Sequence, residues 1–461
     1  MKLFDIYSKM PWWLQNVACT AAGYRIYLQR YGDQFDEFLA RFRQSEWLAR
    51  ESLESMRKER LAHICRVCAD GVPFYQRLFE QTNFDPNHFT IEEFSDKIPV
   101  LTKADVRAHE ADLRNKNFPS SKAFDSKTSG TTGTSVHFLK SYAHSSAQWA
   151  VWWRHRMRFG LRPGDKYANF AGRDVVPTTP LEMPAWRRNL AMNQTYFSIF
   201  HLTDEFLPEI YEYLNRQTYD YISGYPSALM VLATYMNERG LQLQTPPRAI
   251  STGAETLLAF HRNAFRDAFG ARVIDQYGLS EGVANISQCE YGTYHVDEDF
   301  AHVEFLPIAA DQPNVCRIVG THYFNEAMPL LRYDTGDVAT LSDDSCECGR
   351  SLKPIAKIDG RIESVIHTPD GRHVGRLDFI FKDTREVVEA QIIQPAVEEI
   401  VLKVVTTDDY DHASESNIRA KVAKYLGDDI QLRFDYVDMI PREENGKFRA
   451  IISDVDDVQP V

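Results

Sequence analysis

The spacing of hydrophobic residues divides the chain into three parts. Over residues 1–97, apolar side chains recur at helical spacing, most clearly from Glu51 to Asp70, where Gly71 provides a stop. Over residues 98–360, short apolar runs alternate with helical stretches. Residues 361–461 contain strand-like runs and one helical stretch, and their length is within the usual range for a small domain.

The middle part predicts an α/β fold. Four of its short apolar runs end in glycine, at Tyr167–Gly172, Tyr219–Gly224, Arg248–Gly253 and Val273–Gly278, and helical stretches such as 227–239 and 257–269 separate them. This alternation predicts mixed, mostly parallel sheets covered by helices. Because ligands of such folds bind beyond the carboxyl ends of the strands, the glycine-terminated ends are where functional residues are expected.

The last part predicts a small α+β domain. Strand-like residues Glu399–Val405 precede a predicted helix over 414–425 and a second strand over 431–437. Asp370-Gly371 is a hairpin signal near the start of this part. The pattern indicates a compact unit that is separate from the α/β part.

Charge and composition exclude several classes of protein. The chain has 461 residues and a net charge of −13, so a nucleic-acid backbone is not expected as a partner. No apolar run is long enough to span a bilayer, and Asp5 and Lys9 interrupt the stretch that a signal peptide would need. Seven cysteines, an odd number in a long chain, do not indicate a disulfide framework. We therefore expect a reduced, cytoplasmic protein.

Two N-terminal features have both a structural and a functional interpretation. Cys65 and Cys68 have metal-like spacing with His63 nearby, but they fall inside a predicted helix without a second pair, which favours buried thiols. Trp12 and Trp13 could touch a membrane surface. Packing against the body of the protein, or against a second subunit of a homodimer, is the interpretation we prefer, because tryptophans usually bury.

A run of small hydroxyl residues and glycines from Ser126 to Ser135 has the composition of a phosphate-binding loop. Gly130 and Gly133 allow backbone conformations in which successive N–H groups form an anion-binding nest. Hydroxyl donors flank these glycines, and Thr132 or a neighbour could reach a phosphate-bound Mg²⁺. No lysine follows either glycine, so the run is not a P-loop. A flexible linker of small polar residues is the alternative.

Four further motifs follow this run in order. Tyr277 offers a flat face for a base and Glu281 a carboxylate for a metal ion, whereas Asp337 could accept hydrogen bonds from two ribose hydroxyls. Asp359-Gly-Arg361 stands at the predicted domain junction, and Lys447 lies in a glycine-containing loop. Each residue alone could equally be structural, as a packed tyrosine, a turn aspartate, a surface arginine or a solvated lysine. Their joint occurrence in this order is what indicates a function.

With these motifs the chain resembles the adenylate-forming ligases, the superfamily of acyl- and aryl-CoA synthetases, and best matches their phenylacetate–CoA ligase branch. The matching motifs are Ser129-Gly-Thr-Thr-Gly133, Tyr277-Gly-Leu-Ser-Glu281, Tyr333-Asp-Thr-Gly-Asp337, Gly360-Arg361 and Asn445-Gly-Lys447. Stretches near Gln29–Phe35 and Val72–Gln76 are similar to members found in capsular and exopolysaccharide gene clusters.

The resemblance implies an AMP-forming reaction in two steps. A carboxylate attacks the α-phosphate of ATP, pyrophosphate leaves, and the acyl-adenylate passes to a thiol or an amine. It also implies a helical region over 1–97 that packs on an ATP- and carboxylate-binding large domain over 98–360. A small mobile domain over 361–461 would carry the catalytic lysine and rotate between the two steps.

The resemblance also assigns site residues. Lys447, Glu281 and Thr132 would act in catalysis, with Mg²⁺ bridging phosphate and Glu281. The remaining nucleotide contacts that it implies are Ser129, Gly130, Thr131, Gly133, Thr134, Gly253, Ala254, Glu255, Gln276, Tyr277, Gly278, Ser280, Asp337 and Arg361.

Departures from the family pattern concern the cradle, the hinge and the acyl pocket. Thr134 stands where family cradles often have lysine, and Ser364 stands where the hinge commonly has an acid or a lysine. Phe138, Tyr225 and Pro226 lie where this branch lines its acyl pocket, as does Ser251–Glu255. Aromatic walls would suit an aryl or apolar acid, although aromatics are also ordinary core material.

The acceptor of the acyl group has two candidates. CoA is expected from the family branch, and Arg372, His373 and Arg376 could contact its phosphates. An amine or amino sugar is the alternative, which would make the protein an amide- or ester-forming ligase of polysaccharide biosynthesis. A non-catalytic nucleotide-binding homologue is a second alternative, although it would have no need of Lys447, Glu281 and Asp337 together.

A zinc site is predicted from three cysteines and a histidine. Cys289-x₅-His295 and Cys346-x-Cys348 lie on glycine-containing stretches, and three thiols with one imidazole form a complete tetrahedral set. Similar residues recur in the ligase branch. A zinc ion bound by all four side chains would have no open coordination position and would be structural. The alternative is that the cysteines are reduced and bind no metal, with the histidine near them in the sequence by chance.

Overall fold

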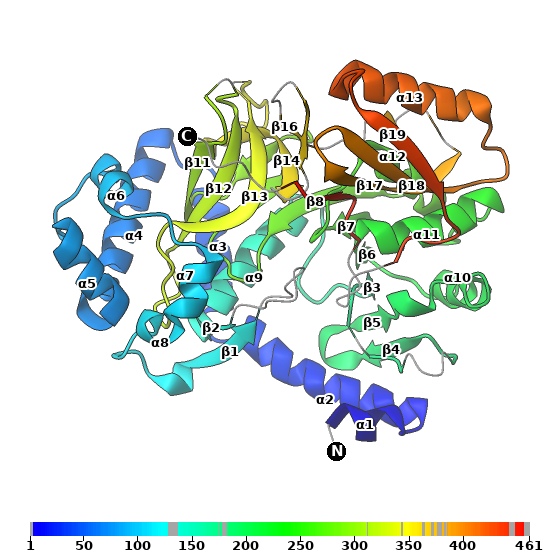
Figure 1. Cartoon of the computed structure of the whole chain (residues 1–461). Helices are drawn as coiled ribbons and strands as arrows, with labels where there is room; N and C mark the ends of the chain where they lie inside the picture. The colour runs from blue at the N-terminus through cyan, green and yellow to red at the C-terminus, as the bar shows by residue number, and fades with distance from the viewer. Residues whose placement is uncertain are drawn as a thin grey trace. The chain divides into compact units, whose positions relative to one another are not determined.

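The structure is a computed structural model, drawn in Figure 1. It describes residues 3–127, 137–173, 175–177, 182–310, 312–342, 344–361, 365–369, 373–375, 380–381, 384, 386–441 and 448–455. The predicted phosphate cradle, Ser129 to Thr134, and Lys447 lie outside these residues, as do Ser364, Arg372 and Arg376.

The chain forms two compact units, each built from several segments. The first comprises 1–167, 187–195 and 274–358, and the second comprises 168–186, 196–273 and 359–461. This division is by contacts and differs from the predicted boundaries at 97/98 and 360/361, which stay a prediction.

The first unit begins with helices. The predicted helix over 51–70 is confirmed as α4 (Arg50–Gly71), which buries Cys65 and Cys68 as expected of structural thiols. The other helices of this unit are α1 (Leu3–Ser8), α2 (Trp12–Arg30), α3 (Phe35–Ser45), α5 (Pro73–Thr82), α6 (Ile91–Lys97), α7 (Lys103–Ala108), α8 (Glu110–Leu113) and α9 (Tyr142–Met157). Thr90 and Thr102 start α6 and α7 with capping boxes, in which threonine and an acidic side chain satisfy each other's backbone N–H groups.

The strands of the first unit are mostly antiparallel. They are β1 (Ala123–Lys127), β2 (His137–Ser141), β8 (Arg272–Gly278), β9 (Asn285–Gln288), β10 (Tyr294–Val296), β11 (Ala301–Pro307), β12 (Val315–His322), β13 (Tyr333–Leu341) and β14 (Pro354–Arg361). The pairs β8–β9, β9–β10, β10–β14, β11–β12 and β12–β13 all run antiparallel. The expectation of mostly parallel strands does not hold in this stretch, because its short connections contain no crossover helix and short connections permit only antiparallel neighbours.

The second unit contains the predicted strand–helix alternation. The predicted runs form β3 (Tyr167–Phe170), β6 (Tyr221–Gly224) and β7 (Ala249–Thr252), and β6 pairs with β7 in parallel. The predicted helices are α11 (Pro226–Glu238) and α12 (Ala259–Phe269), which lie side by side (Figure 1). With α10 (Leu207–Asn215) they bury a core that includes Ile222, Leu229, Ile250 and Phe265. Strands β4 (Trp186–Asn189) and β5 (Gln194–Phe197) lie at the boundary of the two units, since residues 187–195 belong to the first.

The C-terminal part has the predicted α+β character. The hairpin signal lies between β15 (Val365–His367) and β16 (His373–Gly375), which pair antiparallel. A second sheet has the order β19-β18-β17-β20 and consists of β17 (Val387–Ala396), β18 (Glu399–Thr406), β19 (Gln431–Tyr436) and β20 (Ile451–Ser453). Helix α13 (His412–Leu426) packs on it through Ile418 and Val422.

Two global expectations can be compared with the structure. None of the seven cysteines, all of them in described residues, forms a disulfide bond. Among the described helices, none combines the length and the apolar character that crossing a bilayer requires. Trp12 and Trp13 do not pack against the body of the chain, because both are more than half exposed, and their packing against a second subunit stays a prediction.

Candidate active site

The carboxyl end of β8 meets β13, although their residues are far apart in sequence. The hydroxyl of Tyr277 donates a hydrogen bond to Oδ2 of Asp337 over 2.8 Å. Behind it, Gln276 Nε2 donates to Oδ1 of Asn285, and Asp275 accepts from Tyr294. The predicted base-stacking tyrosine and the predicted ribose-binding carboxylate therefore belong to one site.

The backbone of β13 holds Asp337 in place. Its N–H donates to Oγ1 of Thr335, and that hydroxyl donates to the carbonyl of Ile318 on β12. The N–H of Gly336 donates to Asp334. Asp337 is thus positioned by its main chain, and its carboxylate accepts a hydrogen bond from a tyrosine hydroxyl that a ligand could replace.

Glu281 lies buried after β8 and is oriented at both its side chain and its backbone. Oε1 accepts a hydrogen bond from the hydroxyl of Tyr333 over 3.0 Å, and its carbonyl accepts one from Nε2 of His322 over 2.8 Å. Burial lowers the pKa of His322 to about 3, so the neutral ring can donate at Nε2 while Nδ1 accepts the N–H of Leu330.

The residue after Glu281 must be glycine. Gly282 has φ +76°, in the left-handed region that glycine favours, and a Cβ at this position would collide with the ring of His144. The tight turn at Gly282 brings the backbone of Glu281 against His322, which explains why glycine follows the Tyr277–Glu281 motif.

Lys140 is a site residue that the sequence analysis missed. It lies on β2, immediately beyond the predicted cradle, and is buried. Its Nζ donates to Oε1 of Gln148 over 2.5 Å and to the carbonyl of Ser280 over 3.1 Å. Burial lowers the pKa of Lys140 to about 8, while the nearby charge of Glu281 opposes that decrease. The sequence feature that could have identified Lys140 is the presence of a lysine in a short apolar strand next to the phosphate-binding motif.

In the second unit, the loop after β7 contains the predicted contacts Gly253, Ala254 and Glu255. Ala254 adopts a left-handed conformation with φ +69°. The carboxylate of Glu255 accepts hydrogen bonds from the N–H and hydroxyl of Ser227, at the start of α11, and from the N–H of Phe448. These bonds give Glu255 a structural role, so its role as a nucleotide contact stays a prediction.

The predicted hinge glycine lies near the same loop. Gly360 has φ +98°, and a Cβ there would come within 3.0 Å of Oγ1 of Thr256. Arg361 follows as the last residue of β14. Tyr225 and Pro226, predicted to line the acyl pocket, stand at the first turn of α11 beside the residue that Glu255 binds.

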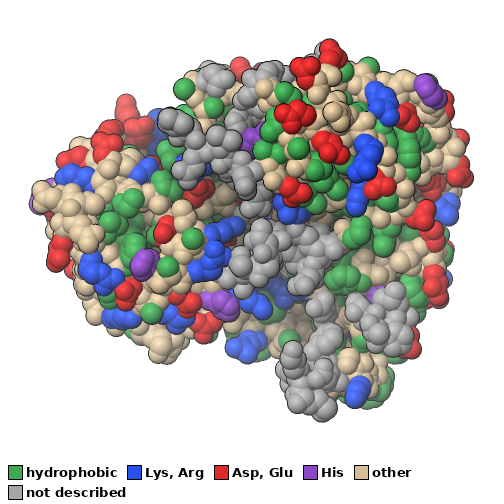
Figure 2. All heavy atoms as spheres, viewed as in Figure 1, with side chains coloured by type: hydrophobic (Ala, Val, Ile, Leu, Met, Phe, Trp, Pro, Cys, Tyr) green, Lys and Arg blue, Asp and Glu red, His purple; other side chains and the backbone are tan. Residues whose placement is uncertain are grey.

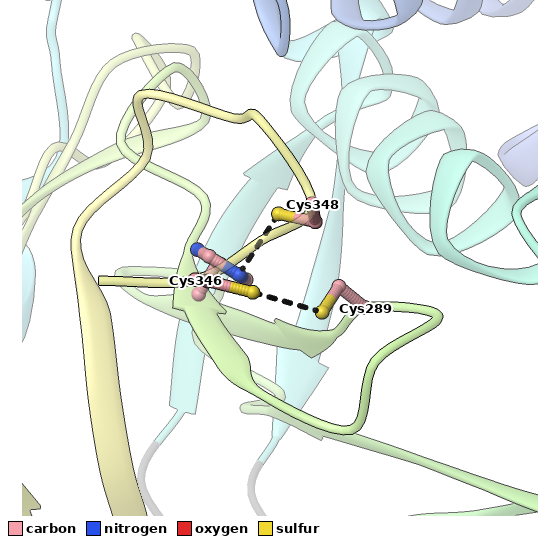
Figure 3. A group of neighbouring side chains, drawn as sticks. Cys289, Cys346 and Cys348 are labelled. Atoms are coloured by element: carbon pink, nitrogen blue, oxygen red, sulfur yellow. Dashed lines mark hydrogen bonds between the residues drawn. The ribbon is translucent and has the colours of Figure 1, made fainter. Parts of the chain in front are cut away.

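The four predicted metal ligands converge. Their ligand atoms all lie within 4.8 Å of one another, with Cys289 Sγ 3.6 Å from Cys346 Sγ and Cys348 Sγ 3.4 Å from His295 Nε2. In Figure 3 the sulfur atoms of Cys346 and Cys348, which share one loop, lie close to the sulfur of Cys289 on another loop. A tetrahedral zinc with ordinary bond lengths would set sulfur–sulfur and sulfur–nitrogen edges of about 3.5–3.8 Å. The observed spacing fits that ion.

Neighbouring groups hold these ligands in orientation. Nδ1 of His295 lies 3.0 Å from the carbonyl of Leu352, which leaves Nε2 facing the sulfurs with its lone pair. Arg350 binds both carboxylate oxygens of Glu290 and also Glu46, the residue directly after α3. The arginine therefore connects the Cys346–Cys348 loop to the loop that follows Cys289.

The site residues fall into three groups. Tyr277, Gly278, Ser280, Glu281 and Asp337 come together in the first unit, with Gln276 at the preceding position. Gly253, Ala254, Glu255 and Arg361 lie in the second unit. Ser129, Gly130, Thr131, Thr132, Gly133, Thr134 and Lys447 lie outside the described residues, and their roles stay predictions.

Comparison with known proteins gives consistent results. The CapK C-terminal domain family matches residues 366–454. Protein CapK of Staphylococcus aureus is 25% identical over 458 residues, covering 98% of this chain and 99% of that protein. Phenylacetate-coenzyme A ligase of Thermus thermophilus is 28% identical over 456 residues, covering 88% and 98%. A crystal structure of 2-hydroxyisobutyryl-CoA ligase, in the postadenylation state in complex with R3-HIB-AMP, superposes with a TM-score of 0.68 at 18% identity, covering 89% and 91%.

Proposed function

The chain has the fold of the adenylate-forming CoA ligases, and from that fold and its site we propose that it activates a carboxylic acid with ATP and transfers the acyl group to CoA. The observation that carries the proposal is the hydrogen bond between Tyr277 and Asp337, beside the buried Glu281. Three residues with separate predicted roles in ATP binding thus share one site.

In the first step the site binds and orients ATP. The ring of Tyr277 stacks on adenine, and Asp337 accepts hydrogen bonds from the ribose hydroxyls after exchanging its tyrosine partner for them. Carboxylate oxygens are ligands that Mg²⁺ prefers, so Glu281 holds the ion that accompanies ATP. The ion neutralises phosphate charge, and Lys140 adds a buried cation near Glu281.

Lys447 provides the positive charge for adenylation. The transition state concentrates negative charge at the α-phosphate and the attacking carboxylate, so a cation there lowers the barrier. Phe448, the residue after Lys447 in the sequence, donates its N–H to Glu255 in the loop after β7. We propose that the cradle, Ser129 to Thr134, holds the β- and γ-phosphates and that the domain over 361–461 moves Lys447 away for the second step.

We propose a structural zinc at Cys289, His295, Cys346 and Cys348. Zinc bound by four protein ligands has no open position, so it would fix the two loops and take no part in the reaction. The fit of the interatomic distances and the orientation of His295 support this assignment.

The second step distinguishes CoA from another acceptor. Similarity to a phenylacetate–CoA ligase over most of the chain favours CoA. The equally extensive similarity to Protein CapK, together with the sequence resemblance to polysaccharide-cluster proteins, supports an amino sugar or amine as the alternative acceptor. A non-catalytic homologue is disfavoured by the intact Lys447, Glu281 and Asp337.

Mass spectrometry of products from a panel of carboxylic acids with ATP, in the presence and absence of CoA, tests the proposal. We expect AMP and an acyl-CoA to form with at least one acid. If CoA leaves both AMP release and product mass unchanged while an amine accelerates turnover, the acceptor is not CoA. If no acid in the panel yields AMP or supports ATP–pyrophosphate exchange, the proposed activity is refuted.

A further inference from the structure

Helix α2 presents its apolar side chains to solvent. Among the described residues, thirteen large hydrophobic side chains are exposed, and eight of them lie on α1, α2 or the short 3₁₀ helix over 190–192. The exposed members of this set are Ile6, Trp12 (54%), Trp13 (55%), Val17 (61%), Tyr24 (57%), Tyr27, Leu28 (51%) and Leu190 (66%). We name this set the α2 face. Such a concentration marks an interaction surface.

The α2 face is a continuous stripe. Trp13, Val17, Tyr24 and Leu28 follow at intervals of four, seven and four residues, which places them within about 60° of one another around a helix axis. The opposite side of the helix is buried and carries Gln15, Cys19 and Gly23. The helix therefore buries its small and polar residues and exposes its aromatic ones, the reverse of an ordinary surface helix.

Polar contacts hold α2 in this orientation. Oε1 of Gln15 accepts a hydrogen bond from Nε of Arg187, and Oδ1 of Asn16 accepts one from the N–H of Arg188. The hydroxyl of Thr20 accepts the N–H of Leu190. Because these bonds fix the buried side, the exposure of Trp13 and its neighbours is a property of the folded unit.

The α2 face is also cationic. No Asp or Glu occurs from Ile6 to Gly32 or from Arg187 to Thr195, and Asp5 on α1 directly precedes the first of these segments, although the chain contains 65 acidic residues and has a net charge of −13. Lys9, Arg25 and Arg188 are exposed in these segments. Acidic and basic side chains are interspersed over much of the face drawn in Figure 2. Exposed aromatic residues combined with cations complement an anionic lipid surface.

We infer that the α2 face docks the protein on anionic membranes, with the tryptophans at the level of the lipid headgroups. The helix lies on the surface and does not cross it. A second copy of the chain fits less well, because a twofold contact would set this cationic face against itself without an acid from either segment to pair with.

Vesicle co-sedimentation with the full chain tests the inference, using phosphatidylcholine vesicles with and without phosphatidylglycerol. We expect binding to the anionic vesicles that weakens with added salt. Trp13→Ser should weaken it roughly tenfold through the lost apolar burial. Arg25→Glu should weaken it roughly twentyfold, at about fivefold for each unit of charge near the surface. Met439→Ser and Arg266→Glu alter exposed residues elsewhere and should leave binding within about twofold.

The vesicle experiments contain no substrate, so they test the inference independently of the proposed activity. The variants change exposed side chains, and unchanged melting temperatures would confirm that they fold. Sedimentation of the wild-type chain that anionic lipid does not increase, or equal weakening by the control variants, would overturn the inference. A dimer that forms without lipid and dissociates in Trp13→Ser would also overturn it, because a second copy would then cover the face.

Discussion

Replacement of Asp337 by alanine tests the nucleotide site most directly. The backbone of Asp337 is held through Thr335 and β12, so the turn does not depend on the carboxylate. In the free protein the variant loses the acceptor for the hydroxyl of Tyr277, a bond of 2.8 Å. Loss of one hydrogen bond to a charged group costs about 1.5–3 kcal/mol, which sets the upper range for the change in the free energy of unfolding.

The expected effect on ATP binding is larger. Two ribose hydroxyls bound to a carboxylate would contribute about 3–6 kcal/mol, from which the displaced tyrosine bond of about 1.5–3 kcal/mol must be subtracted. The net loss in Asp337→Ala is about 1.5–3 kcal/mol, or roughly 10- to 150-fold in the dissociation constant.

Calorimetric titration with ATP measures this loss, and Tyr277→Phe is the matched control. The phenylalanine variant keeps the aromatic face and removes only the competing hydroxyl, so by the same accounting it should bind ATP more tightly, by up to about 1.5–3 kcal/mol, the opposite direction to Asp337→Ala. If Asp337→Ala binds ATP as tightly as wild type while its melting temperature collapses, the aspartate is structural and the ribose assignment is refuted.

Four further predictions concern the metal, the lysines and pH. Protein purified without chelator should contain one zinc per chain by elemental analysis, and Cys346→Ser should lower both zinc content and melting temperature; no stoichiometric zinc in the wild type would refute the site. Lys447→Ala should abolish acid-dependent ATP–pyrophosphate exchange yet retain transfer from a pre-made acyl-adenylate, and wild-type exchange would contradict its role. If the charge of Lys140 acts on the phosphates, Lys140→Met should weaken ATP binding about tenfold in the same calorimetric titration, with little change in folding. Unchanged ATP affinity would show that Lys140 is a structural residue. Burial lowers the pKa of His302 to about 3, and neither ring nitrogen has a hydrogen-bond partner among the described residues. As the pH falls below about 6.5, the unfolded chain takes up a proton at this histidine before the folded chain does, so the free energy of unfolding decreases. In His302→Phe the decrease, measured by urea titration at several pH values, should be shallower by about 1.4 kcal/mol per pH unit. An equally steep decrease in the variant would refute this.

Local pattern determined the elements that the sequence analysis predicted correctly. Helix α4 and the strands β6, β7 and β18 follow from apolar periodicity within a few residues, and glycine marks the ends of α4, β6 and β7. The metal set could also be predicted, because three thiols and an imidazole are chemically complete whatever their separation. The order of the motifs along the sequence indicated the fold family, because each motif contains residue types whose chemistry can be recognised without the tertiary structure.

Contacts between distant segments decided the rest. The bond between Tyr277 and Asp337 and the burial of Lys140 depend on strands brought together by the tertiary fold, which no local spacing encodes. The antiparallel course from β8 to β14 depends on which neighbours the short connections select. Trp13 is exposed because Gln15 and Cys19 turn the other side of α2 inward. Residue type gives the tendency of a tryptophan to bury, but only the packing of the whole unit determines which side of its helix meets solvent.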